Sequence, residues 1–328
     1  MRRREFITLL GGAAAAWPVA ARAQQGGRVR RIGVQMNLAA DDQEGQARIA
    51  AFQQGLQELG WSVGRNVRID YRWGGGDDRF RKNASELVAL APDVILAVTS
   101  TVTAALQRES RAVPIVFVST IDPVGNGLVG NLARPGGNAT GFTVFEYGIS
   151  PKWLELLKEI APQVTHVGII RDPTSPAQIG LMGGIQSAAP TFAVELRMID
   201  ARDTGEIEGD LAALARSLQA GLIVMPEAFM NIHRAEVASL AAHYHLPAVY
   251  PRRFFVVLGG LLSYGIDLAD NFPRAAAYAD RILKGERPAD LPVLQSTKFE
   301  FVINLQTAKA LGIEVPLPVQ QLADEVIE

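Results

Sequence analysis

One order of segments occurs twice in this chain, and it constrains the fold more than any other feature of the sequence. In the first copy, the apolar run 93–98 is followed by a Thr-Ser-Thr corner, an Ala-rich helix and a second apolar run, 113–118. About 130 residues later, the run 221–225 is followed by Pro-Glu-Ala, a helix and the run 246–250. Short apolar runs of this kind are typical of parallel strands buried on both faces. The repeated order therefore predicts an α/β protein with two Rossmann-like lobes, each a doubly wound parallel sheet.

The predicted helix 269–283 decides how the two lobes are connected. It follows the strands of the second lobe, but it is most easily placed against the first, and that placement requires three linking segments. We expect a first lobe of residues 28–142 plus 266–292 and a second lobe of residues 143–265 plus 293–328. Ser263–Gly265 is a flexible point suited to the second crossing. Three linking segments favour hinge motion between the lobes.

The N-terminus has the pattern of an export signal. Residues 1–23 contain an Arg-Arg-Glu-Phe segment, an apolar stretch and an Ala-Arg-Ala cleavage site, which together predict a twin-arginine signal peptide. Pro18 and Arg22 interrupt the apolar stretch well before it could span a membrane. The chain has no Cys, which excludes disulfides and a Cys-linked lipid anchor. We therefore expect a soluble periplasmic protein.

Composition excludes several classes of function. Hydrophobic residues make up 48% of the chain and charged residues 20%, as in ordinary globular proteins rather than disordered ones. The net charge is −2 and no basic stripe is present, so we expect no nucleic-acid partner. Four His and no Cys make a metal site or a nucleophile–base pair hard to assemble, so we predict no metal and no catalytic residue.

Ligands of open parallel sheets bind beyond the carboxyl ends of the strands, which here face a cleft between the lobes. Thr99 and Ser100 precede a helix, where such residues either cap the helix or help its amides to hold a carboxylate. Acids opposite these hydroxyls suit a ligand with an ammonium and a carboxylate, although Arg253 could equally bind a carboxylate in bidentate fashion. The predicted ligand-binding residues are Gln35, Thr99, Ser100, Thr120, Asp122, Asp172, Glu227, Phe229, Tyr250, Tyr264 and Asp267.

A glycine pattern leaves one enzymatic alternative open. Gly125–Gly130 has the spacing of a dinucleotide-binding fingerprint, and Glu146 lies near the distance expected for a ribose ligand. A periplasmic oxidoreductase with a dinucleotide cofactor is therefore the alternative. Against it, the glycines begin several residues after the strand, and Pro135–Gly137 interrupts the helix that they should open. We prefer a binding protein without a cofactor, which is not an enzyme.

Several stretches along most of the chain carry a family resemblance. The most specific is Leu132–Gly141, and the others are Arg3–Phe6, Ala91–Ile95, Pro114–Phe117, Asp122–Gly125, Lys152–Leu157, Tyr264–Gly265 and Phe301–Asn304. On these stretches the chain resembles periplasmic ABC-transporter substrate-binding proteins of the tryptophan/tyrosine-type family, which have the type I periplasmic-binding fold. The glycine fingerprint is then part of a long loop before the first hinge strand.

This resemblance implies a function and a set of contacts. A protein of this family captures a small solute, here an amino acid or related small carboxylate, with aromatic ones included, and delivers it to a membrane permease driven by an ATPase. By place in the fold, Ser100 and Thr120 match the residues that hold a carboxylate, and Glu227 matches the acid that holds an ammonium. We expect a monomer. A sensor lobe for a membrane receptor is a further alternative, because the same fold serves both roles.

Overall fold

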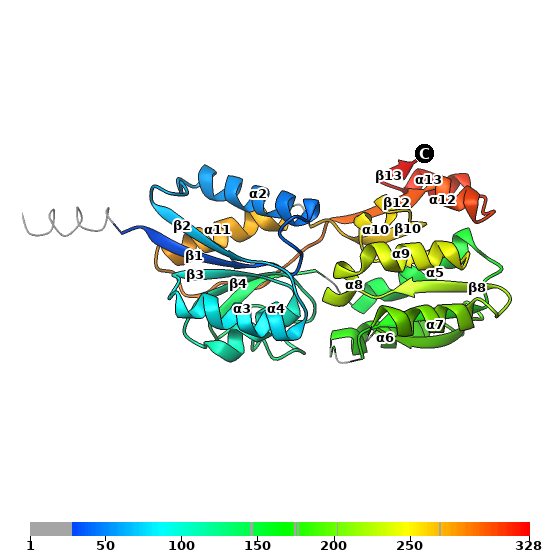
Figure 1. Cartoon of the computed structure of the whole chain (residues 1–328), viewed down its shortest axis with the longest axis horizontal. Helices are drawn as coiled ribbons and strands as arrows, with labels where there is room; N and C mark the ends of the chain where they lie inside the picture. The colour runs from blue at the N-terminus through cyan, green and yellow to red at the C-terminus, as the bar shows by residue number, and fades with distance from the viewer. Residues whose placement is uncertain (1–27, 145–146, 174, 176, 202, 269) are drawn as a thin grey trace, which may run out of the picture.

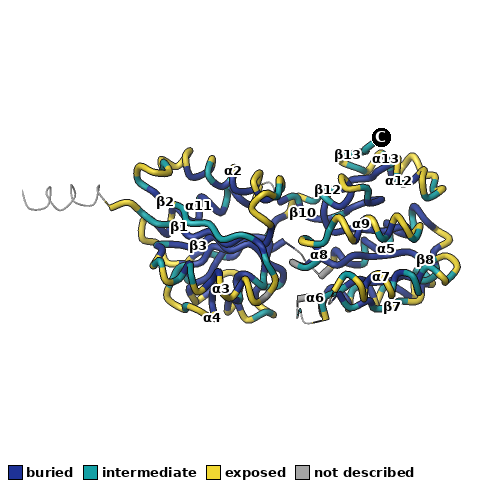
Figure 2. The backbone as a smooth tube through the Cα atoms, viewed as in Figure 1, coloured by how far each residue is buried: buried dark blue, intermediate teal, exposed yellow. Residues whose placement is uncertain are grey.

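Two lobes lie side by side, each built around one sheet, in the computed structural model of this chain (Figure 1). The structure describes residues 28–328 except positions 145, 146, 174, 176, 202 and 269, so the predicted signal peptide and Glu146 lie outside the described residues. The strands form the buried centre of each lobe, and the exposed residues gather on the helices and loops around them (Figure 2). The predicted α/β architecture of two sheet-based lobes is confirmed.

The first lobe has a six-stranded sheet in the order β11-β5-β4-β3-β1-β2, in which all neighbours are parallel. Its elements are β1 (Arg30–Gln35), α2 (Gln43–Glu58), β2 (Val67–Arg72), α3 (Asp77–Ala89), β3 (Val94–Val98), α4 (Ser100–Glu109), β4 (Ile115–Thr120), β5 (Ala139–Thr143), α11 (Asn271–Leu283), η2 (Pro288–Asp290) and β11 (Leu294–Gln295). β3 and β4 are buried along their whole length, as continuous apolar runs require.

Helices cover both faces of the first sheet. α2 and α11 lie on one face and α3 and α4 on the other (Figure 1). Gly55 allows α2 and α11 to pack closely, because a Cβ at this position would lie 2.9 Å from the Cβ of Ala276. α11, which follows the strands of the second lobe in sequence, thus belongs to the core of the first lobe.

The second lobe has a seven-stranded sheet in the order β13-β12-β10-β9-β8-β6-β7. Its elements are η1 (Tyr147–Ile149), α5 (Ser150–Ile160), β6 (His166–Arg171), α6 (Ala177–Ala188), β7 (Glu195–Asp200), α7 (Thr204–Leu214), β8 (Ala220–Val224), α8 (Ala228–Ile232), α9 (Arg234–His243), β9 (Ala248–Tyr250), α10 (Arg253–Val257), β10 (Leu262–Ile266), β12 (Phe299–Asn304), α12 (Leu305–Ala310), α13 (Leu317–Leu322) and β13 (Glu325–Ile327). β10 and β12 are antiparallel, and the other described neighbours are parallel.

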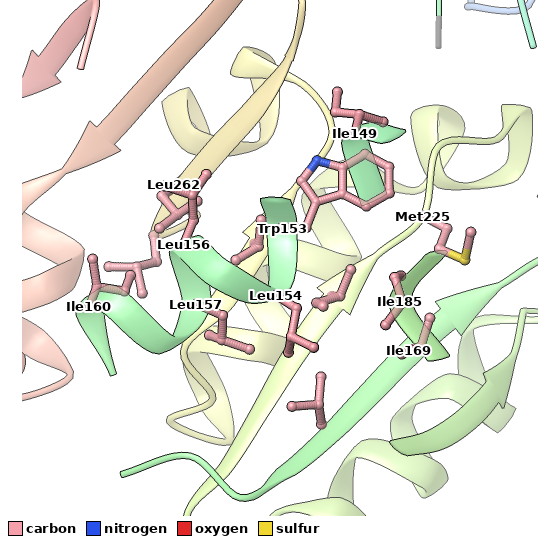
Figure 3. Packing of buried hydrophobic residues seen from close by; sticks show 14 of the residues in the cluster. Ile149, Trp153, Leu154, Leu156, Leu157, Ile160, Ile169, Ile185, Met225 and Leu262 are labelled. Carbon is pink, nitrogen blue, oxygen red and sulfur yellow. The ribbon is translucent and has the colours of Figure 1, made fainter. Parts of the chain in front are cut away.

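Trp153 on α5 lies at the centre of the second core (Figure 3). The indole is fully buried, and its Nε1 donates a hydrogen bond to the backbone oxygen of Tyr264, at 2.7 Å. The Tyr264 ring in turn stacks on Phe299 of β12, with ring centroids 5.5 Å apart. These contacts hold α5 against β10 and β12. The chain leaves for the first lobe at the C-terminal end of β10 and returns at the N-terminal end of β12.

The chain passes between the lobes three times, after β5, after β10 and between β11 and β12. This confirms the predicted three-segment hinge, but the predicted position of the second crossing was wrong. Ser263–Gly265 lies inside β10 and pairs with β12, so the crossing begins after Ile266. β11 pairs with β5 just beyond the segment 266–292 that we assigned to the first lobe.

Across the described part of the chain, no helix has both the length and the apolar character that a membrane span requires.

Candidate functional site

Two connected spaces lie between the lobes. The inner one is a cavity of about 20 Å³ lined by Arg48, Thr99, Ser100, Ser119, Ile121, Pro226, Glu227, Asn231, Arg252 and Leu268. The outer one is a cleft of about 590 Å³, within the range of small-molecule sites. Arg48, Arg252 and Leu268 line both spaces.

The first lobe's wall of the inner cavity is the corner between β3 and α4. Thr99 has a φ of 88°, and its side chain caps α4 by accepting a hydrogen bond from the amide of Val102 at 3.5 Å. The hydroxyl of Ser100 accepts from the amide of Ile121 at 3.0 Å and donates to the Ile121 carbonyl at 3.3 Å. Ser100 therefore ties this corner to the end of β4. Its contact with a ligand stays a prediction.

Glu227 connects the second lobe to the first. It follows β8 and is 7% exposed. One carboxylate oxygen accepts from the hydroxyl of Thr101 in the first lobe, at 3.4 Å, and the other accepts from the hydroxyl of Ser175, at 2.9 Å. This acid thus lies at the wall of the inner cavity, where the family resemblance places the residue for an ammonium.

Two buried arginines are the site residues that the sequence analysis missed. Arg48 on α2 is 6% exposed, and its Nε donates to Glu44 at 3.0 Å. Arg252, just before α10, is 7% exposed, and its Nη1 donates to the Ile266 carbonyl at 3.1 Å. Burial lowers the pKa of both guanidinium groups. For Arg252, burial and then the charge of Arg48 lower the pKa to about 9.

Other polar atoms near the inner cavity are buried and have no hydrogen-bond partner among the described residues. The hydroxyl of Ser119 and the side-chain oxygen of Asn231 line the cavity, are buried, and have no such partner among the described residues. The Thr120 hydroxyl and the Gln35 side-chain oxygen share this property at the carboxyl ends of β4 and β1, although neither residue lines the cavity. Buried polar atoms of this kind are uncommon in native proteins.

Several predicted residues lie outside the inner cavity. Asp267 lines the outer cleft, with its carboxylate 2.7 Å from the Lys298 ammonium. Asp122 accepts from the amide of Gly125, at 2.8 Å, and so stabilises a turn. Asp172 lines a separate groove of about 360 Å³, which also runs between the lobes beside Ser100. Gln35 donates to the Phe80 carbonyl, at 2.9 Å, and ties β1 to α3.

The predicted aromatic residues pack within the second lobe instead of lining the inner cavity or the outer cleft. Tyr250 is buried and stacks on Phe255, with ring centroids 4.9 Å apart. Phe229 packs against His233 at 4.4 Å between ring centroids, and Tyr264 stacks on Phe299 as described above. The apolar walls of the outer cleft come from other residues, among them Phe254 and Phe272.

Arg253 does line the outer cleft, but its guanidinium makes two hydrogen bonds of 2.7 Å to the carboxylate of Glu325. The guanidinium group of Arg253 is therefore already paired with Glu325, an acidic residue of the same lobe.

The glycine pattern does not form a dinucleotide site. Residues 121–137 are turns and bends without a helix, and they lead directly to β5. A dinucleotide fingerprint requires a helix whose first amides receive the pyrophosphate, and this stretch provides none. Among the described residues, no three His, Cys, Asp or Glu side chains are grouped as a metal site would require.

A family model for ABC transporter substrate-binding proteins matches residues 33–327. This chain belongs to that family. A tyrosine-binding protein of Clostridioides difficile is 25% identical to this substrate-binding protein over 264 residues, which make up 80% of this chain and 76% of that protein.

Solved structures share the architecture of this substrate-binding protein. A conserved domain protein of Vibrio cholerae superposes with a TM-score of 0.84 at 25% identity, covering 91% of this chain and 100% of that one. The ABC domain of Streptococcus pneumonia in complex with L-Trp gives a TM-score of 0.83 at 24% identity, covering 91% and 99% of the two chains. The type I periplasmic-binding fold predicted from the sequence is confirmed.

Proposed function

We propose that this substrate-binding protein captures a small carboxylate solute, an amino acid or a close relative of one, between its lobes and delivers it to the membrane permease of an ABC importer. The observation that carries the proposal is the inner cavity, whose walls come from both lobes and contain buried charges of both signs. A solute that contacts both walls stabilises the lobes in contact, and a permease can recognise that arrangement.

An aromatic or large apolar side chain fits the outer cleft. Its walls include Phe254, Phe272, Ile266 and Leu268 beside the charged entrance to the inner cavity. The names of two relatives, one a tyrosine-binding protein and the other solved with L-Trp, favour the same class of ligand. Predominantly apolar sites with a few well-placed polar groups are typical of small-molecule binding.

The remaining parts of the proposal follow from the sequence. The Arg-Arg signal at the N-terminus supports export to the periplasm by the twin-arginine route. We expect the exported protein to act as a monomer, without a cofactor and without catalytic activity. Transport is preferred to sensing because the family takes its name from the transporter.

A binding screen tests the ligand class. The purified full chain is titrated with L-tyrosine, L-tryptophan, a set of other amino acids, aromatic acids without an amine, and neutral polyols, and its thermal unfolding is followed. A ligand at a hundredfold above its dissociation constant should stabilise the folded protein by about 2.7 kcal/mol. Stabilisation by polyols alone, with none of the carboxylates active, overturns the proposed ligand class.

A fractionation experiment tests the export route. The chain is expressed with its own N-terminus in bacteria that have or lack a working twin-arginine translocase, and the periplasmic fraction is probed for the protein. The proposal requires the processed protein in the periplasm of the first strain and its absence there in the second. Equal export in both strains means that the signal uses another route.

A further inference from the structure

Two arginines from opposite lobes line both the inner cavity and the outer cleft. Arg48 comes from α2 of the first lobe, and Arg252 from the segment between β9 and α10 of the second. Both residues line both spaces, and both are more than nine-tenths buried. A single solute in the inner cavity and the outer cleft can therefore reach one cation of each lobe.

Two cations that are buried together carry an electrostatic cost when the lobes come into contact. Burying a charge is costly unless an opposite charge accompanies it, and two like charges in one site raise the cost further. The ionisable residues of the inner cavity's walls are Arg48, Arg252 and Glu227, two cations and one acid. Glu44 lies beside Arg48 in the outer cleft and accepts a hydrogen bond from the Nε of Arg48. Its carboxylate therefore offsets part of the positive charge of Arg48 from one side.

We propose that Arg48 and Arg252 together bind the carboxylate of the solute, one guanidinium from each lobe, and that this shared contact couples carboxylate binding to closure. The inference rests on the proposed function and names the residues that select its ligand class. Guanidinium groups suit this role because their planar set of N–H donors matches a carboxylate. An anion between them relieves their repulsion only when the lobes come together.

The inner cavity also gives the solute an orientation. At about 20 Å³ it has room for a group of about the size of one water molecule. Its walls offer acceptors to such a group, namely the Glu227 carboxylate, the Asn231 side-chain oxygen and the Ser119 hydroxyl. An α-amino acid therefore fits across the site in one orientation. Its ammonium lies in the inner cavity, its carboxylate contacts the two arginines, and its side chain lies in the outer cleft.

The test pairs arginine variants with solutes that lack one charged group. Wild type, Arg48→Gln and Arg252→Gln are titrated by calorimetry with L-tryptophan, tryptamine and indole-3-propionate, and with the matching tyrosine series. Arg197→Gln is the matched control, because Arg197 pairs with Asp210 on the outside of the second lobe. Thermal unfolding of each variant is measured in parallel. Arg48→Lys and Arg252→Lys, which keep the charge without the planar fork, replace a glutamine variant that does not fold.

The expected result is a specific loss. Either glutamine variant should bind the amino acid and its des-amino acid about ten- to a hundredfold more weakly, because one charge-assisted contact to the carboxylate is gone. Each should bind the amine that lacks a carboxylate at least as tightly as wild type does, because no carboxylate contact is lost and the repulsion between the two arginines is removed. The Arg197→Gln control should match wild type throughout. Small-angle scattering should show that the amino acid compacts wild type but compacts the glutamine variants less.

Two outcomes overturn the inference alone. If the amino acid binds both glutamine variants as tightly as wild type, the arginines do not hold its carboxylate, while the proposed function stands. If the amino acid and the amine lose affinity equally, Arg48 and Arg252 act through the structure of the site and not through the carboxylate. Failure of every carboxylate in both series to bind wild type overturns the proposed ligand class and the inference together.

Discussion

Arg234 on α9 of the second lobe forms an ion pair with Asp42, the residue that caps α2 of the first lobe. Replacing Arg234 with alanine should therefore weaken the arrangement in which the lobes touch. Both partners are well shielded in this arrangement, since the Arg234 side chain is 19% exposed and that of Asp42 is 9% exposed. Opening the lobes returns both groups to water.

The size of the effect follows from which contacts opening would break. A hydrogen bond between charged groups contributes about 1.5–3 kcal/mol, and solvent screening at this partly exposed site reduces it to about 1–2 kcal/mol. The guanidinium of Arg234 also lies 5.3 Å from the ring centroid of Phe254, but both residues belong to the second lobe, so this contact survives opening. Asp42 likewise keeps its hydrogen bond from the amide of Gly45. Of these contacts only the ion pair joins the two lobes, and the repulsion between Arg234 and Arg48 acts across the lobes in the opposite direction.

A weaker closed arrangement lowers affinity for any solute that binds between the lobes. A loss of about 1–2 kcal/mol corresponds to about a five- to thirtyfold higher dissociation constant, and it should enter through faster dissociation. Calorimetry and stopped-flow fluorescence with L-tryptophan measure both, and Arg197→Ala, which breaks an ion pair within one lobe, is the control. Unchanged affinity and dissociation rate in Arg234→Ala, with wild-type values in the control, would refute the assignment of this pair to closure.

Two further predictions concern the pH dependence of solute affinity and the stability of a glycine variant. Burial by itself raises the pKa of Asp42, but the hydrogen bond and charge of Arg234 outweigh it, so that the pKa lies below its ordinary value. The Asp42 carboxylate then supports closure fully above about pH 4, and this support is lost as the pH falls through the lowered pKa. Solute affinity is measured from about pH 6 to pH 3. It should fall more steeply at the acid end of this range in wild type than in Arg234→Ala. At Gly141, where φ is +150° and a Cβ would lie 2.0 Å from the Phe117 carbonyl oxygen, alanine should cost about 3 kcal/mol or more of folding stability in denaturant unfolding. Gly209→Ala, in open space on α7, is the control, and equal stability of the two variants would contradict the steric argument.

The fold could be predicted because its main signals are local. A strand buried on both faces needs an unbroken apolar run, and β3, β4 and β8 supply one each within a repeated order of segments. The position of α11 in the first lobe followed from the connectivity alone. Short elements such as β11 and β13 escaped prediction, because two or three residues contain no period that distinguishes a strand from a loop.

The site was less predictable, because burial of a charged residue depends on the opposite lobe. Thr99, Ser100 and Glu227 follow strand ends and were predicted by that rule, and all three line the inner cavity. Arg48 stands on an amphipathic helix, where an arginine normally faces solvent, yet it is buried, with its guanidinium 6.0 Å from the ring centroid of Phe272 in its own lobe. Tyr250 ends a strand as predicted, but the alternation of side chains along a strand turns its ring into the core. The sequence contained one signal for Arg252, since it lies two residues after the end of β9, at the edge of the sheet where ligands bind.

The three passages of the chain between the lobes restrict how the molecule can move. Strands linked by one connection could swivel about it in any direction, whereas three connections at the same edge leave bending as the easy motion and resist twisting. With such a hinge, a solute enters through the opening of the cleft on the side away from the hinge. The two lobes then return to the same relative orientation each time they close. A cut in one passage would still leave two, so a nicked molecule should hold its halves together.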